Sequence, residues 1–168
     1  MIRIVNWLDR HIEEVILMTL LSLMVIVVVI QVFMRYVMNN SLSWPEELTR
    51  YFFIWFTFVG MSYCISNNSN VKIDIFVNIF PSRVQAVILL IVDLSVLVFF
   101  IFLGSHGISA LAKIVKSGQQ SPALGIPMEF VFASLEFGIG LGIIRTIQVM
   151  LKKINALRKN IRQGADVI

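Results

Sequence analysis

Four long apolar segments determine what this chain can fold into. Each approaches the roughly 20 mostly apolar residues that a helix needs to cross the hydrocarbon core of a bilayer, which is about 30 Å thick. The predicted spans are residues 15–36, 44–65, 84–106 and 128–150, and a basic tail follows over residues 151–168. Only helices and closed barrels satisfy their backbone groups in lipid, and unbroken apolar runs are not the alternating pattern of a barrel. The sequence therefore predicts an all-α integral membrane protein, a single membrane domain with four transmembrane helices.

The composition excludes several other classes of protein. Of 168 residues, 58% are hydrophobic and 14% are charged, whereas a soluble domain has about 25% charged residues. The single cysteine, Cys64, excludes a disulfide scaffold and a zinc site built on several thiolates. His11 and His106 fall at opposite ends of predicted spans, too far apart to ligate one haem. We expect no cofactor, no metal and no enzymatic activity.

The positions of Lys and Arg predict the orientation. Four spans place both termini and the loop between the second and third spans on one side of the membrane. That side carries ten of the 14 Lys and Arg residues, and the other side carries four. Because positive residues accumulate on the cytoplasmic side, we expect both termini in the cytoplasm, with the basic tail near anionic membrane lipids. No basic face is left free of the membrane, so nucleic acid is not an expected partner.

The start of the second span carries more charge than a helix start requires. Ser43 and Glu46 fit a capping box, and Pro45 falls in the first turn, where its missing N–H costs nothing. Glu46 and Arg50 are spaced i,i+4 and can pair. Two readings stay open: a well-started helix anchored at the membrane interface, or a docking surface for another subunit. The candidate interface residues are Trp44, Glu46, Glu47, Arg50, Tyr51 and Trp55.

The same stretch resembles a known family. The pattern S-W-x-E-E-L-x-R-Y-x-F-x-W over residues 43–55 resembles the small membrane subunit of tripartite ATP-independent periplasmic (TRAP) transporters, the DctQ-like family. The resemblance continues in NVKIDIF at 70–76, in the Phe-Pro pair at 80–81 and in SPALGIP at 121–127. One departure is Asn70, which stands where such families often have a His before the Ile-Asp pair.

The resemblance implies a transport function in the bacterial inner membrane. A small subunit of this kind binds a large membrane subunit, which contains the substrate and sodium sites and works as an elevator. A periplasmic substrate-binding protein delivers an organic acid, commonly a C4-dicarboxylate or a sialic acid, and uptake is driven by an ion gradient. The small subunit would then act as an accessory scaffold.

The residues agree with an accessory role, because secondary transporters usually need paired repeats and interrupted helices around a midplane site. Four short spans without a clear repeat could hardly enclose a solute path. The alternative is a small homo-oligomeric, proton-coupled exporter with Asp93 or Glu136 at a dimer interface.

Gln31, Asp93 and Glu136 are polar residues that lie well inside the predicted spans. An acid in the bilayer costs a few kcal/mol unless it is paired, hydrogen-bonded or protonated. We expect Asp93, near the middle of the third span, to be buried against the partner subunit in a neutral or hydrogen-bonded form. A role in proton coupling is the alternative.

Two interhelical ion pairs are expected, one near each side of the membrane. Glu136 should pair with Arg35 or Arg50 at the outer edge. At the inner edge, Arg145 should pair with an acid at the start of the first span, Glu13 or Glu14.

Small residues and amphipathic segments complete the predictions. Gly138 and Gly142 form a small-xxx-small face, which suits either internal packing or contact with the partner subunit. Residues 1–12 and 71–80 have apolar residues at helical spacing, which is typical of helices lying in the membrane interface. For residues 1–12 a simple loop is an equal alternative.

Overall fold

The computed structural model describes residues 2–67 and 82–165 of the chain. Within these residues the protein folds into four helices, α1 (Ile2–Tyr36), α2 (Trp44–Ser66), α4 (Ser82–Ser117) and α5 (Glu129–Ala165). Each helix contains a stretch long and apolar enough to cross a membrane: His11–Tyr36, Trp44–Ser66, Val87–Ser117 and Glu129–Asn155. The prediction of an all-α protein with four transmembrane helices is confirmed.

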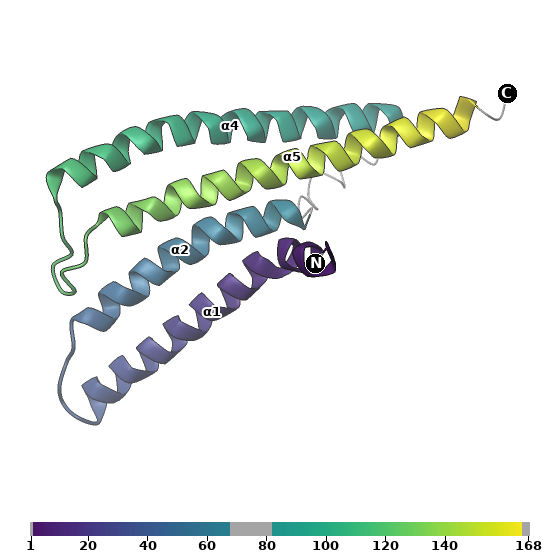
Figure 1. The fold of residues 1–168 in the computed structure, drawn as a ribbon. Coiled ribbons are helices and arrows are strands. Elements are labelled where there is room, and N and C mark those ends of the chain that lie inside the picture. Colours follow the sequence, from purple (N-terminus) through teal and green to yellow (C-terminus); the bar gives the residue numbers. More distant parts are fainter. Residues whose placement is uncertain (1, 68–81, 166–168) are drawn as a thin grey trace.

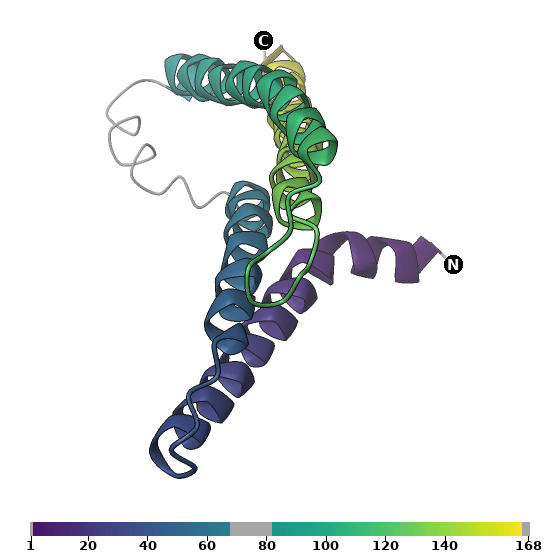
Figure 2. The ribbon, with the colours of Figure 1, turned by 90° about the vertical axis from the view of Figure 1, so that its left-hand side faces the viewer.

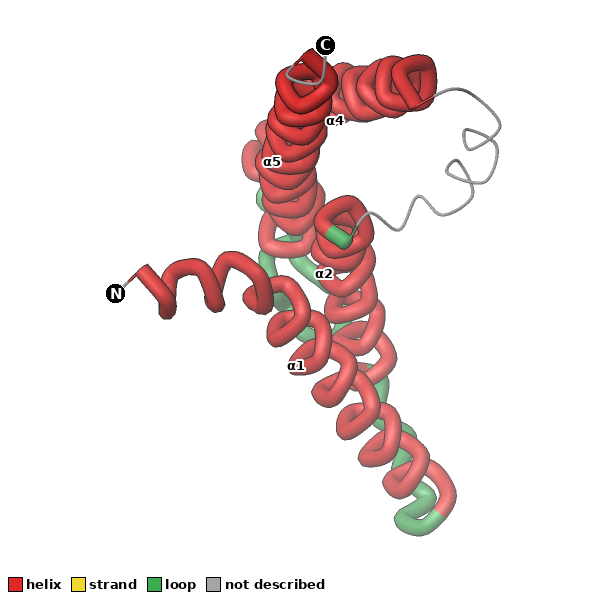
Figure 3. Tube along the Cα trace, turned by 90° about the vertical axis from the view of Figure 1, so that its right-hand side faces the viewer, coloured by secondary structure: helices red, strands yellow, loops and turns green. Residues whose placement is uncertain are grey.

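The helices run beyond the predicted spans at three places. Helix α4 continues to Ser117, past the predicted end at residue 106, and α5 continues through most of the basic tail to Ala165. Residues 2–12 do not form a loop or a separate helix, since α1 is helical from Ile2 onward. Figure 3 shows the first turns of α1 running across the direction of the rest of that helix. The predicted amphipathic segment at 71–80 lies outside the described residues.

The four helices lie side by side in one curved layer, in the order α1, α2, α5, α4 (Figures 1 and 2). Extensive contacts join α1 to α2, α2 to α5 and α5 to α4. Helix α5 is the most enclosed, with 39% of its apolar window buried, compared with 11 to 17% for the other three. Over residues 2–67 and 82–165, the helices form an open layer without the enclosed centre of a compact four-helix bundle (Figure 2).

Two glycines allow α5 to approach its neighbours closely. A Cβ atom added at Gly138 would lie 2.6 Å from the Cβ of Phe58 on α2, and one at Gly142 would lie 3.1 Å from the ring of Phe100 on α4. Both glycines are buried. The structure therefore uses them for packing inside this chain, which is one of the two predicted uses; a contact with a partner subunit stays a prediction.

The two outer helices expose most of their large apolar side chains. Helix α1 exposes residues such as Val25, Val29 and Phe33, and α4 exposes residues such as Ile91, Val98 and Phe102. Surfaces of this size are covered by lipid or by another protein in a membrane. The layer thus presents apolar side chains outward along its length.

Candidate functional site

Glu47, in the first turn of α2, binds the loop that connects α4 to α5. The backbone N–H groups of Ala123 and Leu124 donate to Glu47 Oε2 over 2.8 and 3.2 Å, and the Tyr51 hydroxyl donates to Glu47 Oε1. Glu47 is buried, so its carboxylate is satisfied by donors from two elements, as buried polar groups require. This residue fixes the connection between α4 and α5 to α2.

The connection between α4 and α5 is itself closed by hydrogen bonds. Ser121 receives the Ile126 N–H on its hydroxyl and donates its own N–H to the Ile126 carbonyl, over 3.2 and 2.9 Å. The N–H of Met128 donates to the Gln119 carbonyl over 2.9 Å. Gly125 has a φ of +65°, a backbone conformation that glycine adopts without steric cost. The loop therefore has a defined shape, set by its own backbone and by Glu47.

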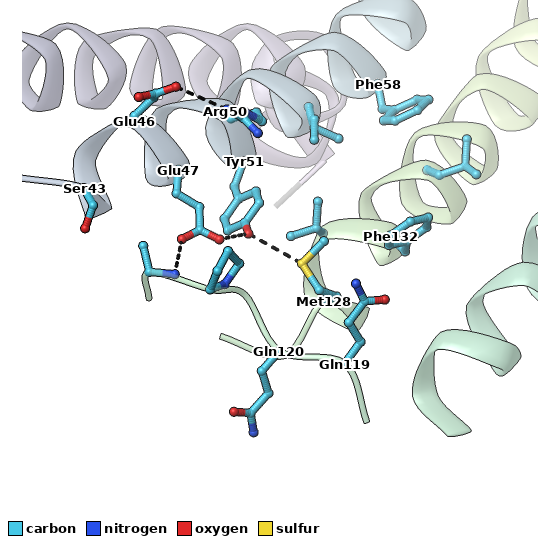
Figure 4. Close-up of a pocket in the computed structure, with 15 residues that line it drawn as sticks. Ser43, Glu46, Glu47, Arg50, Tyr51, Phe58, Gln119, Gln120, Met128 and Phe132 are labelled. Atoms are coloured by element: carbon cyan, nitrogen blue, oxygen red, sulfur yellow. Dashed lines mark hydrogen bonds and ion pairs between the residues drawn. The ribbon is translucent and has the colours of Figure 1, made fainter. Parts of the chain in front are cut away.

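Between this loop and the first turns of α2 and α5 lies a cavity of about 550 Å³ (Figure 4). Its polar end includes Glu46 and Arg50, whose side chains pair over 3.3 Å and are largely exposed. Gln119 and Gln120 of the α4–α5 loop also line it. Along the two helices the lining becomes apolar: Ile54, Phe58, Met128, Val131, Phe132 and Leu135. The cavity thus has one charged rim and one apolar half.

The six predicted interface residues of α2 have divided roles. Glu47 and Tyr51 are buried against the loop, and the Trp55 ring packs on Phe137 of α5 with the centroids 5.7 Å apart. Trp44 is half-buried, and Glu46 and Arg50 face outward. Only part of this set is therefore free to meet another molecule.

The predicted capping box does not form. Ser43 has helical dihedrals, with φ −87° and ψ −30°, and its side chain makes no capping hydrogen bond. Glu46 turns to Arg50 instead of reaching back to the N-cap. Pro45 does occupy the first turn, as predicted.

At the opposite end of the helices, the predicted inner ion pair is confirmed. Arg145 Nε lies 2.8 Å from Glu13 Oε1, and the side chains are 7% and 1% exposed. The Ser62 hydroxyl donates to the same Glu13 oxygen over 2.8 Å, and Arg145 Nη1 donates to Gln148 over 2.7 Å. This group joins α1, α2 and α5. Ser62 and Gln148 were missed, because short polar side chains are common in membrane helices and carry no signal of their own.

Asp93 has a partner within this chain. Lys153 Nζ lies 2.7 Å from Asp93 Oδ2, and the two side chains are 25% and 7% exposed. Asp93 is not near the middle of its helix, since α4 extends from Ser82 to Ser117 and Asp93 lies in its first third. Asp93 is therefore buried and hydrogen-bonded, as predicted, but its partner is a cation of this chain. The sequence did not indicate this cation, because the true ends of α4 and α5 bring Lys153 of the tail to the depth of Asp93.

Glu136 does not form the predicted outer pair. Its Oε1 atom is buried and has no hydrogen-bond partner among the described residues. The carboxyl group packs against Gly107 and Gly104 of α4, whereas Arg50 pairs with Glu46 on α2. The guanidinium of Arg35 lies 5.8 Å from the centroid of the Tyr36 ring. The prediction failed because Glu136 faces α4, and both candidate arginines lie on the other side of α5.

Gln31 is half-buried in α1. Among the described residues, no group of three His, Cys, Asp or Glu side chains is placed to hold a metal ion.

Comparison with known proteins identifies the family. Residues 24–156 match the family described as tripartite ATP-independent periplasmic transporters, DctQ component. A proposed TRAP transporter small permease protein of Haemophilus influenzae is 35% identical over 129 residues, which are 75% of this chain and 78% of that protein. The C4-dicarboxylate TRAP transporter small permease protein DctQ of Vibrio cholerae is 29% identical over 58% of this chain and 45% of its own length.

A further relative is much longer than this chain. The isethionate TRAP transporter permease protein DctMQ of Oleidesulfovibrio alaskensis is 26% identical over 151 residues, which are 86% of this chain but 24% of that protein. The family match, the order of the motifs and the four apolar helices agree in placing the protein in a bacterial inner membrane as a multi-pass subunit. The chain belongs to the DctQ component family of the tripartite ATP-independent periplasmic transporters, as a small permease subunit.

Proposed function

We propose that this chain is an accessory scaffold that binds the large membrane subunit of a TRAP transporter and stabilises its static part. Uptake by the assembled transporter would be driven by a sodium gradient. In this proposal both termini are cytoplasmic, and the loop that contains Ser121 lies on the periplasmic side. A periplasmic substrate-binding protein meets the assembled complex and delivers the solute.

The observation that carries the proposal is the open layer of helices. A solute path needs polar groups enclosed between helices, and such groups normally converge near the midplane of a transporter. Here Glu13 and Arg145 pair with each other, and Asp93 pairs with Lys153, all toward one end of the layer. What the layer offers is a broad apolar surface on α1 and α4, which suits helix packing in lipid.

The length of the isethionate relative supports a large-subunit partner. In that permease protein the part similar to this chain is 24% of the length, so it shares one polypeptide with a much larger remainder. We infer that the residues of this chain make the corresponding contacts with such a large membrane part.

The substrate class proposed is an organic acid, of the C4-dicarboxylate or sialic acid kind. Two relatives are named for isethionate and for C4-dicarboxylates, which are organic acids. In this proposal the substrate and sodium sites lie in the large subunit, so the residues of this chain would not contact the solute.

Reconstitution into proteoliposomes tests the proposal. The chain alone should move neither succinate nor sialic acid, and adding the large subunit and the binding protein should give uptake that requires an inward sodium gradient. Solute-dependent proton movement by the chain alone would support the alternative, a homo-oligomeric exporter, and would overturn the scaffold role. If the complete system transports neither acid, the substrate class is wrong, and stable copurification of this chain with the large subunit still tests the scaffold role.

A further inference from the structure

From the cavity beside Arg50 we infer a binding site for one glycerophospholipid with a zwitterionic ethanolamine headgroup. The lipid would come from the leaflet on the side of the α4–α5 loop. One acyl chain would occupy the apolar half of the cavity, and the headgroup would lie at Glu46 and Arg50. This inference requires only that the protein spans the membrane, and it holds whether or not the chain acts as a scaffold.

The lining of the cavity changes character with depth. Arg50, Ile54 and Phe58 follow one another along α2 at intervals of about one turn, so they span about 12 Å along the helix axis. Val131 and Leu135 of α5 line the cavity in the same direction, with Met128 just before the start of that helix. Figure 4 shows Ser43, Glu46 and Glu47 toward one end and Phe58 and Phe132 toward the other. A polar rim followed by an apolar interior is the polarity profile of a lipid near the membrane surface.

Lining residues are exposed both at the charged rim of the cavity and in its apolar half. The side chains of Arg50 and Glu46 are 66% and 72% exposed, and Phe132 is 37% exposed at the apolar side. A volume of about 550 Å³ lies within the range of 300–1,000 Å³ typical of small-molecule sites, which is enough for a large part of an acyl chain.

The charges at the rim select the headgroup. Glu47 is already satisfied by Tyr51 and by the loop N–H groups, so Glu46 and Arg50 are the charged side chains free to interact. Their mutual contact is long and solvent-exposed, and such pairs contribute little stability, so a ligand can replace it at small cost. Arg50 matches a phosphate and Glu46 matches an ammonium group. A purely anionic headgroup would meet repulsion from Glu46.

Native mass spectrometry of the full-length chain, released from detergent micelles, tests the site. The chain is mixed with equimolar palmitoyl-oleoyl phosphatidylethanolamine and phosphatidylglycerol. We expect one phosphatidylethanolamine to be retained in preference to phosphatidylglycerol. Ile54→Trp fills the apolar half and should lower retention by at least about tenfold, the loss expected when roughly two methylene groups can no longer be buried.

The control is Phe53→Trp, which also introduces a tryptophan but at the neighbouring, exposed position of α2. It should retain the lipid like the unmodified chain. Glu46→Gln should shift the preference toward phosphatidylglycerol. Lys113→Gln removes an exposed charge on α4, at the same end of the helix layer, and should leave the preference unchanged.

Several outcomes would overturn the inference. One is equal retention by Ile54→Trp and the unmodified chain, and another is equal loss in both tryptophan variants. A third is competition by glycerophosphoethanolamine, which is the headgroup without acyl chains. If it displaced the bound lipid as effectively as free phosphatidylethanolamine does, the ligand would bind at the rim alone. If Ile54→Trp kept the lipid but no longer copurified with the large subunit, the cavity would be occupied by that protein.

Discussion

Buried charged groups in the described part of this chain are stabilised in different ways. Glu13, Arg145 and Asp93 have ionic partners, and Glu47 is held by hydrogen-bond donors alone. The sequence predicted that Arg145, a rare charge inside an apolar span, pairs with Glu13 or Glu14 at the same depth, and the structure selects Glu13. The pair of Asp93 and Lys153 was not, because its depth depends on where α4 and α5 end. Glu136 has no partner at Oε1, because the direction in which it leaves α5 is set by tertiary packing.

Removing one partner of the buried pair should be strongly destabilising. Arg145→Met leaves the Glu13 carboxylate without its main cationic partner, and we expect the free energy of unfolding in detergent to fall by about 3–5 kcal/mol. Glu13→Gln combined with Arg145→Met should recover much of this loss. Denaturant titration followed by tryptophan fluorescence measures both.

The exposed pair provides the control for that experiment. Glu46→Gln breaks an ion pair that is open to solvent, and the expected loss is at most about 1 kcal/mol. Losses of similar size in Glu46→Gln and Arg145→Met would contradict the assignment of the buried pair as an interhelical clamp.

Glu136 should be replaceable without a loss of stability. Its buried Oε1 atom lacks a hydrogen-bond partner in the described part of the chain, and an unsatisfied buried polar group costs about 1–3 kcal/mol. Glu136→Met keeps a similar volume against Gly107 and should raise the thermal unfolding temperature of the detergent-solubilised protein. Glu129→Met, at the first residue of α5, is the comparison. A marked decrease for Glu136→Met would mean that the carboxyl group makes a stabilising contact.

At the scale of the helix, the interfaces of α5 decide how the layer holds together. Figure 1 shows α5 between α2 and α4. At each of these two interfaces a glycine of α5 lets the neighbouring helix approach closely. The sequence indicated a close approach through its glycines but did not indicate toward which helix. Gly138 faces α2, Gly142 faces α4 and Gly140 has open space beside it.

Adding one methyl group should distinguish these glycines. Gly138→Ala places a Cβ atom 2.6 Å from the Phe58 Cβ and 2.8 Å from its carbonyl oxygen, so the two backbones must separate. We expect a loss of about 1–3 kcal/mol in unfolding free energy, as for other overpacked sites. Denaturant titration in the same detergent provides the measurement.

Gly140→Ala is the matched control, because nothing lies within 4 Å of a Cβ atom there. It should be neutral or slightly stabilising, since alanine favours helix more than glycine does. Equal effects at both positions would show that α2 and α5 do not approach at Gly138.

At the scale of the whole molecule, the prediction concerns orientation. The count of Lys and Arg predicts cytoplasmic termini and a periplasmic α4–α5 loop. In a Cys64→Ser background, a membrane-impermeant maleimide added to spheroplasts should label Gln120→Cys in the loop. It should label Asn155→Cys near the basic tail only after permeabilisation. Labelling of Asn155→Cys in intact spheroplasts would reverse the orientation.

The sequence by itself determined that the protein lies in a lipid bilayer and that its fold is all-α. Apolar segments of bilayer length leave helices as the solution. The rare charge of Arg145 inside them predicted an ion pair with Glu13 or Glu14. Only the tertiary structure decided the order α1, α2, α5, α4 and the cavity beside Arg50. It also assigned Glu47 to the loop and Lys153 to Asp93. The physical reason is that hydropathy sets how deep a residue lies in the membrane, whereas the rotation of each helix and its neighbours follow from packing between side chains far apart in the chain.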